Sequence, residues 1–307
     1  MLNILLATFE QMTVFFIIIV TGYFLSKKRF LPENTDAVLS KLLSRVVMSA
    51  LCFNTFSTNF KVENIKTNLG LFVCGAVVLL VTLFAGRLLA PLFAKDKYVQ
   101  NIYTYSLTIS NLGYMGYPIS QAVFGDKAMF NMMVFCIPFS MFIYSFGYAM
   151  LNPLNKKVTF KSLVNPTFFG MILGAIVGLF NIKLPTPVSN ALSMVAVPMA
   201  FLAMIVTGFV IAKYPFKEII YNKKVYVASF LRLVAIPSVV VTVLKLLNLP
   251  QNYILSALCA LSMPLGLNTV VFPASYGADT RHGASMALIS TLGAMITIPL
   301  MLSVFGG

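Results

Sequence analysis

Two segments, one in each half of the chain, combine glycine, proline and asparagine inside otherwise apolar stretches. The first reads Ser-Asn-Leu-Gly-Tyr-Met-Gly-Tyr-Pro at 110–118, and the second reads Ser-Met-Pro-Leu-Gly-Leu-Asn-Thr at 262–269. Glycine and proline interrupt a helix and leave backbone groups without partners. Free N–H groups at the start of a half-helix, together with amide donors from Asn111 and Asn268, attract an anion such as a carboxylate. The two segments therefore predict an anion-binding site.

Few other residues are arranged for chemistry. His282 is the only histidine, so the sequence has no HExxH zinc site and no evident Ser–His pair. The four cysteines lie far apart in apolar runs without CxxC spacing, a pattern typical of buried, unreactive thiols; they are Cys52, Cys74, Cys136 and Cys259. We therefore expect no catalytic residues, no metal and no cofactor, and an enzyme is the least favoured class.

The composition indicates a membrane protein. Of the 307 residues, 59% are apolar and 10% are charged, whereas a soluble globular chain is about 25% charged. Ten apolar segments are long enough to cross a bilayer: approximately 6–26, 37–58, 67–90, 99–123, 128–151, 164–182, 187–212, 225–247, 251–275 and 283–305. The prediction is an all-α, multi-pass protein of ten transmembrane helices with the lipid bilayer as its partner.

The basic residues are distributed in a way that predicts orientation. One set of alternate loops carries thirteen Lys and Arg residues, whereas the opposite set carries five, which are Lys61, Lys66, Lys127, Lys183 and Lys245. Basic loops face the cytoplasm, so we expect a plasma (inner) membrane protein with both termini outside. The net charge of +14 is then an orientation signal, and nucleic acid is not expected as a partner.

The ten segments divide into two sets of five, residues 1–153 and 161–307, joined by a basic cytoplasmic linker at 154–160. Because five is odd, the second set enters the membrane from the opposite side. This is an inverted repeat, the architecture of many secondary transporters. Each interrupted segment is the fourth of its set, and paired breaks of this kind point to a binding site near the midplane.

Three motifs resemble the auxin efflux carrier family: SNLGYMGYP at 110–118, RLVAIP at 232–237 and PLGLNTVVFPASYGAD at 264–279. This family includes bacterial malate and related organic-acid permeases and is related to the plant PIN-FORMED auxin exporters. The resemblance covers the full chain. It implies a fold similar to sodium/bile-acid symporters, in which discontinuous helices 4 and 9 cross.

The resemblance also implies a mechanism and a set of substrate-binding residues. Helices 1, 2, 6 and 7 are expected to form a scaffold, and helices 3–5 and 8–10 a transport bundle that moves as an elevator; a homodimer is one expected assembly. Asn111 matches the family's crossover asparagine beside the substrate carboxylate, and Pro118 and Pro264 match the helix-breaking prolines. The other expected site residues of the two motifs are Ser110, Tyr114 and Asn268.

On helix 2, residues 49–56 resemble the family's substrate-facing segment, which adds Cys52 and Asn54 to the expected site. Three positions depart from the family. Ser49 stands where a proline is usual, Cys52 where the plant exporters have a serine, and Thr269 where the plant proteins have another proline. These departures favour a small mono- or dicarboxylate over an indole acid as the substrate.

Charged residues within the predicted spans bear on energy coupling. No Asp or Glu lies near either interruption, so the sequence gives no support for a carboxylate proton relay or an acidic sodium cage. Each negative charge that leaves the cell gains about 2.3 kcal/mol per 100 mV, which favours potential-driven efflux or anion exchange. A sodium- or proton-coupled symporter and an anion channel are the alternatives. Arg45 and Arg232 could either draw anions to the site or anchor at headgroups.

Overall fold

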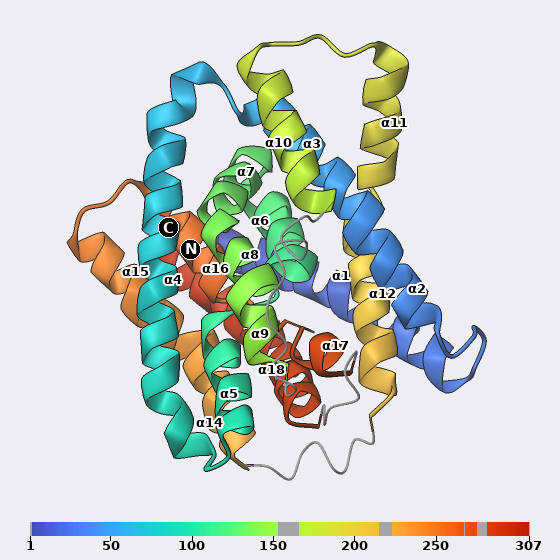
Figure 1. Cartoon of the computed structure of the whole chain (residues 1–307), viewed down its shortest axis with the longest axis vertical. Coiled ribbons are helices and arrows are strands. Elements are labelled where there is room, and N and C mark those ends of the chain that lie inside the picture. The colour runs from blue at the N-terminus through green and yellow to red at the C-terminus, as the bar shows by residue number, and fades with distance from the viewer. Residues whose placement is uncertain (1, 153–165, 215–222, 267, 275–280, 307) are drawn as a thin grey trace.

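The structure, a computed structural model, describes residues 2–152, 166–214, 223–266, 268–274 and 281–306 (Figure 1). The described parts of both halves are helical. The first half contains α1 (Leu2–Lys27), α2 (Thr35–Leu42), η1 (Leu43–Val47), α3 (Met48–Asn59), η2 (Val62–Asn64), α4 (Ile65–Phe93), α5 (Lys97–Thr108), η3 (Leu112–Gly116), α6 (Tyr117–Phe124), α7 (Asp126–Phe135), α8 (Ile137–Phe142), η4 (Ile143–Gly147) and α9 (Tyr148–Met150).

The second half contains α10 (Pro166–Leu179), α11 (Thr186–Ala196), α12 (Met199–Ala212), α14 (Lys223–Phe230), η6 (Leu231–Ala235), α15 (Ile236–Leu246), α16 (Gln251–Leu261), α17 (Asn268–Ala274) and α18 (Arg281–Phe305). Helix therefore occurs in each of the ten segments that the sequence predicts to cross the membrane. The predicted linker at 154–160 lies outside the described residues.

Length and composition identify the best candidates for membrane spans. Within the described residues, five helices are long and apolar enough to cross a bilayer: Leu2–Lys27, Val62–Phe93, Thr186–Ala212, Lys223–Leu246 and Arg281–Phe305. Asp126–Phe135 and Ile137–Met150, bent by 47° at their junction, make a sixth if they are counted as one span. The protein is thus helical and multi-pass, and the count of ten spans stays a prediction.

Helix α10 packs along α3 through a stripe of glycines at four-residue intervals (Figure 1). A Cβ atom on Gly170, Gly174 or Gly178 would lie closer than 3.0 Å to backbone oxygens of α3 or of the residue that follows it. Only glycine permits this approach, and small residues at such spacing let helix backbones pack closely in membranes. The first long helix of the second half is therefore held against the second helix of the first half.

Helix α1 packs along α12 in the reciprocal way, so the first helix of one half pairs with the second helix of the other. Gly22 lies against the backbone of Ile205, and Gly208 lies against the backbones of Ile19 and Gly22. Together α1, α2–α3, α10 and α11–α12 form one group of helices. The group is joined across the halves by backbone contacts that tolerate no side chain at these glycines.

The other helices pack into a second group. Helix α4 lies along α5 and α7, α16 contacts α7 and α15, and α18 contacts α14 and η6. Gly75 of α4 approaches the carbonyl oxygen of Phe135, and Gly86 of α4 approaches that of Thr104, so this group also relies on close backbone packing. The buried side chains of the group include the aromatic residues Tyr103, Tyr105 and Phe139.

The connecting turns lie at two ends of the molecule (Figure 1). The turns from α3 to α4 and from α10 to α11 lie at the top of the view, and the turn from α4 to α5 lies at the bottom. At the top end, Lys61 Nζ donates a hydrogen bond to Asn181 Oδ1 over 3.0 Å. The turns that carry Lys61 and Lys183 therefore share one end, as the alternation of basic loops requires.

Three π-helical segments precede a position that is proline in this chain or in the family it resembles. Proline cannot donate to the carbonyl four residues earlier and clashes with it, so the preceding turn widens. Segment η3 comes before Pro118 and η6 before Pro237. Segment η1 comes before Ser49, whose hydroxyl donates to the carbonyl oxygen of Arg45 over 2.9 Å.

Candidate functional site

The two interrupted segments meet through their backbones. Helix α5 ends at Thr108 and α16 ends at Leu261. The N–H of Asn111 donates to the carbonyl oxygen of Pro264 over 2.8 Å, and Ser110 and Leu265 form an isolated antiparallel bridge. A hydrogen bond of this kind satisfies groups that each helix interruption leaves free. The two breaks therefore stabilise one another.

Neighbouring helices fix this junction in place. The hydroxyl of Ser110 donates to the carbonyl oxygen of Ala260 over 2.5 Å, and the N–H of Leu265 donates to Ser290 Oγ of α18 over 2.9 Å. Gly266 lies so close that a Cβ atom there would be 3.3 Å from the carbonyl oxygen of Ser110. The junction is thus a small, tightly bonded piece of non-helical backbone inside the second group of helices.

Asn111 begins the half-helix formed by η3 and α6. It occupies the N-cap position, but its side chain makes no capping bond, and its amide has no hydrogen-bond partner among the residues that the structure describes. The carbonyl oxygen of Asn111 accepts from the N–H groups of Met115 and Gly116 over 3.3 and 3.0 Å. The N–H group of Gly113 precedes these bonds at the start of the half-helix, where N–H groups have no intrahelical partner.

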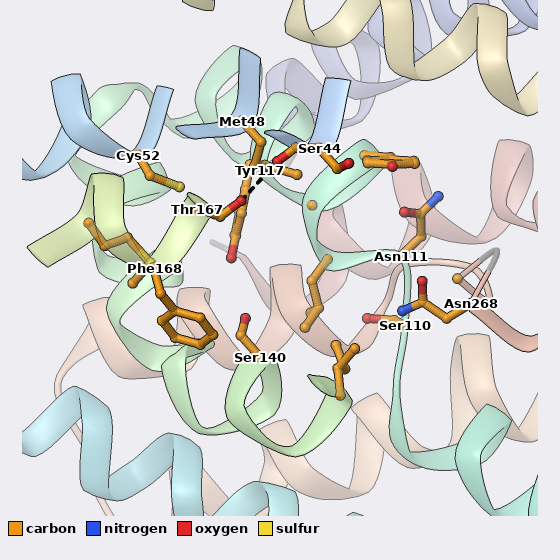
Figure 2. A pocket seen from close by; sticks show the side chains of 16 residues that line it. Ser44, Met48, Cys52, Ser110, Asn111, Tyr117, Ser140, Thr167, Phe168 and Asn268 are labelled. Atoms are coloured by element: carbon orange, nitrogen blue, oxygen red, sulfur yellow. Dashed lines mark hydrogen bonds between the residues drawn. The ribbon is translucent and has the colours of Figure 1, made fainter. Parts of the chain in front are cut away.

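A cavity of about 110 Å³ opens beside this N-terminus, and we call it the central cavity (Figure 2). It lies between the two groups of helices, because α2–α3 and α10 line one side and the interrupted segments and α8–η4 line the other. Its walls are Ser44, Met48, Cys52, Ser110, Asn111, Leu112, Gly113, Tyr114, Tyr117, Ser140, Ile143, Thr167, Phe168, Met171, Gly266 and Asn268.

Among the described residues, no charged side chain lines the central cavity, and the polar side chains that do so are amides and hydroxyls together with the thiol of Cys52. Asn268 Nδ2 donates to Tyr105 Oη over 3.0 Å, and Thr167 Oγ1 donates to the carbonyl oxygen of Ser44 over 3.1 Å. Asn111 lies beside Asn268 at one end of the cavity (Figure 2). The amide of Asn111 and the N-terminus of η3, with the N–H of Gly113, give the cavity hydrogen-bond donors and a positive electrostatic potential.

The eight residues predicted for the site fall in three places. Five of them line the central cavity: Cys52, Ser110, Asn111, Tyr114 and Asn268. Pro264 is buried at the junction and contributes its carbonyl oxygen to the bond with Asn111. Asn54 and Pro118 instead line a separate cavity. The sequence therefore placed most of the predicted residues around one space, and the roles of all eight stay predictions.

This separate cavity, which we call the second cavity, has a volume of about 650 Å³. It lies farther along α3, α6 and α7 and against α11–α12, near the end of the molecule that carries the α3–α4 turn. Its lining residues are Leu51, Asn54, Thr55, Thr58, Asn59, Pro118, Gln121, Asp126, Lys127, Met129, Ser193, Ala196, Val197, Met199 and Ala200. The second cavity and the central cavity follow one another along the boundary between the two helix groups.

Several polar residues of the central cavity are absent from the sequence prediction, namely Ser44, Tyr117, Ser140 and Thr167. Ser44 could have been predicted from the sequence, because it lies two helical turns before Cys52 and therefore on the same helix face. Thr167 and Ser140 lie on helices without an interruption at that position, so only tertiary packing reveals them.

The sequence left open whether Arg45 and Arg232 attract anions or anchor at lipid headgroups, and the structure places the two side chains in different environments. Arg45 is exposed, whereas Arg232 is 1% exposed and is the largest fully buried side chain. Its three guanidinium nitrogens have no hydrogen-bond partner among the described residues. Segment η6, which carries Arg232, packs on α5 and α18, the helices that flank the junction. Arg232 is therefore a buried positive charge in the second helix group. Its side chain does not reach the surface, so it does not anchor the helix at lipid headgroups.

Comparison with known proteins gives consistent matches. The family model described as membrane transport protein matches residues 7–160 and 152–302. The chain is 21% identical over 303 residues to the uncharacterized transporter YfdV of Escherichia coli strain K12, which covers 94% of each chain. It is also 21% identical over 311 residues to an uncharacterized transporter of Methanothermobacter thermautotrophicus, which covers 97% of this chain and 98% of the relative.

Proposed function

The chain belongs to the auxin efflux carrier family of membrane transport proteins, and from this premise we propose that it is a secondary transporter of small organic anions in the plasma membrane. The central cavity carries the proposal. Its described lining has no charged side chain, mixes apolar walls with amides and hydroxyls, and combines the amide of Asn111 with the N-terminus of the η3–α6 half-helix. A mono- or dicarboxylate of a few carbons suits a cavity of about 110 Å³.

The chemistry of the cavity favours a carboxylate over a cation. A carboxylate only accepts hydrogen bonds, and charge-assisted bonds from amides and backbone N–H groups are stronger than neutral ones. The cavity offers such donors from Asn111 and Gly113, and among the described residues that line it none is acidic and would repel an anion. The hydroxyls of Ser44, Ser140 and Thr167 lie across from them and are suited to the far end of the substrate.

In the proposed mechanism the first helix group is a scaffold and the second is a transport bundle that slides along it. Helix α3 supports this division because it lines both cavities, with Met48 facing the central cavity and Thr58 facing the second cavity. The ten residues between them span about 15 Å at 1.5 Å per residue. A bundle movement of that order would carry the Asn111 site from one cavity to the other, which is elevator-type alternating access.

The proposal includes ten transmembrane helices in two inverted halves, residues 1–153 and 161–307, with both termini outside. The reciprocal pairing of α1 with α12 and of α10 with α3 supports it, because an inverted two-fold relation between the halves generates both contacts at once. The crossing of the fourth and ninth helices is supported by the bond between Asn111 and Pro264.

For energy coupling we propose efflux driven by the membrane potential or exchange of one anion for another. Arg232 supplies a positive charge in the bundle, which favours loading of an anion without a co-transported cation. A sodium-coupled symporter is the alternative, since the carbonyl ends of α5 and α16 also lie at the junction. Sodium dependence of uptake in proteoliposomes distinguishes the two schemes.

The experiment that tests the function begins with a thermal-shift screen of the purified protein against small carboxylates, with and without sodium. A ligand that binds only the native state raises stability by mass action. Transport of the best ligand is then measured in proteoliposomes for the native protein and for Asn111→Asp. Normal folding and native transport by Asn111→Asp would place the anion site elsewhere.

A further inference from the structure

A third cavity near the α3–α4 turn is lined mostly by asparagine, and we call it the asparagine cavity. Its volume is about 220 Å³. The lining residues are Asn59, Asn64, Thr67, Asn68, Lys127, Phe130, Asn131 and Asn252, which come from α3, η2, α4, α7 and α16. It shares no lining residue with the central cavity. Five side-chain amides that converge on one small space supply many hydrogen-bond donors and acceptors.

Most of these amides are not used within the protein. Asn68 is 4% exposed, yet its Nδ2 has no hydrogen-bond partner among the described residues. Asn59 Nδ2 donates to the carbonyl oxygen of Thr55 over 2.9 Å, but within the described chain the amides of Asn64, Asn131 and Asn252 form no side-chain hydrogen bond. A buried polar group without a partner is costly, so a bound molecule that pairs with Asn68 would stabilise the native state.

The charge around the cavity selects the kind of ligand. Lys127 is the one charged residue among those that line it, and no carboxylate does so. A metal cation would therefore meet a positive charge and no anionic ligand. A molecule with one negative charge and several hydroxyl groups would pair with the ammonium group of Lys127 and with the amides, while Phe130 supplies an apolar wall.

We propose that the asparagine cavity is a second ligand site, specific for a small hydroxylated monocarboxylate. Lys127 binds the carboxylate, and Asn68 and Asn131 bind the hydroxyl groups. The ligand joins the two helix groups, because Asn59 comes from α3 while the other lining helices, α4, α7 and α16, belong to the second group. In terms of the proposed function, on which this consequence rests, the bound ligand ties the scaffold to the bundle and slows the transport cycle.

Binding is tested by calorimetry on the full-length protein in detergent with three probes. Glycerate carries one carboxylate and two hydroxyls, propionate has the charge without the hydroxyls, and glycerol has hydroxyls without the charge. The measurements use the Asn111→Ala protein, so that binding in the central cavity does not mask the result. We expect glycerate to bind at least tenfold more tightly than propionate or glycerol; equal affinities or no glycerate binding would overturn the proposal.

Variants locate the binding. Lys127→Gln should weaken glycerate binding at least tenfold, whereas the matched control Lys66→Gln, at the same end of the molecule but outside the cavity, should leave it unchanged. Asn68→Leu keeps the side-chain shape and should also weaken binding. Asn131→Leu repeats this test at a less buried position in case Asn68→Leu does not fold. Native glycerate affinity in Lys127→Gln and in the leucine variants would refute the site.

The outcome for this site is separable from that of the transport proposal. If the central cavity is not the anion site, Asn111→Asp transports normally, yet glycerate binding still depends on Lys127. Lys127 also lines the second cavity, whereas Asn68 and Asn131 line the asparagine cavity but neither of the other two. If the asparagine cavity is empty in solution, Asn68→Leu and Asn131→Leu change nothing while Asn111 variants still lose the transported carboxylate.

Discussion

The backbone N–H of Asn111 donates to the carbonyl oxygen of Pro264 over 2.8 Å, across more than 150 residues of chain. This bond occupies the backbone donor of Asn111 and leaves its side-chain amide free at the central cavity. Pro264 has no N–H group, so Asn111 cannot accept a backbone hydrogen bond from it. This pair of residues is joined by one backbone hydrogen bond, in which Asn111 is the donor. The second half of the chain thus holds the residue of the first half that faces the candidate ligand.

The first prediction concerns Asn111. Asn111→Ala removes a charge-assisted hydrogen bond, which is about 1.5–3 kcal/mol or roughly a tenfold to hundredfold loss of carboxylate affinity. Asn111→Asp should be worse, because a fixed negative charge repels the anion. Asn268→Ala should have a smaller effect. Binding and proteoliposome transport are the measurements, and Asn190→Asp, on the exposed part of α11, is the matched control.

The second prediction concerns Arg232. Replacing a buried charge by an apolar residue of similar volume is often neutral or stabilising, so Arg232→Met should keep or raise the melting temperature. It should nevertheless weaken carboxylate binding, while Arg232→Lys keeps the charge and most of the affinity. Arg45→Met, at an exposed position, is the control. If Arg232→Met binds the carboxylate with unchanged affinity, the charge of Arg232 does not contribute to anion loading.

The third prediction concerns the contact between α3 and α10. In Gly174→Ala the new Cβ atom would lie 2.5 Å from the carbonyl oxygen of Phe53. Backbone atoms cannot move aside cheaply, so we expect a loss of about 1–3 kcal/mol, measured as a lower melting temperature in detergent. In the control, Gly293→Ala, the nearest atom is Leu233 Cδ1 at 3.2 Å, a side-chain end that can shift. Equal melting temperatures for the two variants would contradict this packing argument.

The fourth prediction concerns membrane orientation. In a protein without its four native cysteines, Lys183→Cys should react with an impermeant thiol reagent added to intact cells, and Lys95→Cys should react only after permeabilisation. The positive-inside rule is the reason, and both side chains are exposed at opposite ends of the molecule. Reaction of Lys95→Cys in intact cells would reverse the orientation.

The fifth prediction concerns the elevator movement. Tyr114 lines the central cavity and Thr58 lines the second cavity, so cysteines at these two positions should form a disulfide only when the bundle moves along α3. Cross-linking is measured by gel mobility in the cysteine-free background with substrate present. Ser44→Cys with Thr167→Cys joins two parts of the scaffold that are in contact in this state and serves as the positive control. A cross-link for the control alone would argue against the movement.

The helix positions were predictable because apolar runs and their breaks are local features. The structure interrupts helices after Thr108 and after Leu261, where the sequence has its clusters of glycine, proline and asparagine. Proline also accounts for the breaks at Pro138 and Pro198. Pro91, Pro273 and Pro299 do not end a helix, because they lie inside α4, α17 and α18.

The site was only partly predictable, because its walls come from contacts between distant helices. Cys52 and Asn54 are two residues apart on α3 and therefore face different directions, so one lines the central cavity and the other lines the second cavity. The sequence motif at 49–56 contains both residues and does not indicate which of them faces the central cavity. The asparagine cavity was not predictable from local pattern, since single asparagines in five elements give no signal until the elements pack.

The glycine-mediated pairs have a consequence for biosynthesis. Helix α1 pairs with α12 and α3 pairs with α10, so these two helices of the first half wait for partners that are made later. Some 170 residues separate the end of α1 from the start of α12, which takes roughly 10–35 s at a translation rate of about 5–20 residues/s. During that interval the bare glycine stripes face lipid or an insertion factor. The scaffold therefore cannot be completed until the second half is inserted, and quality control of the nascent protein has its longest opportunity before α12 arrives.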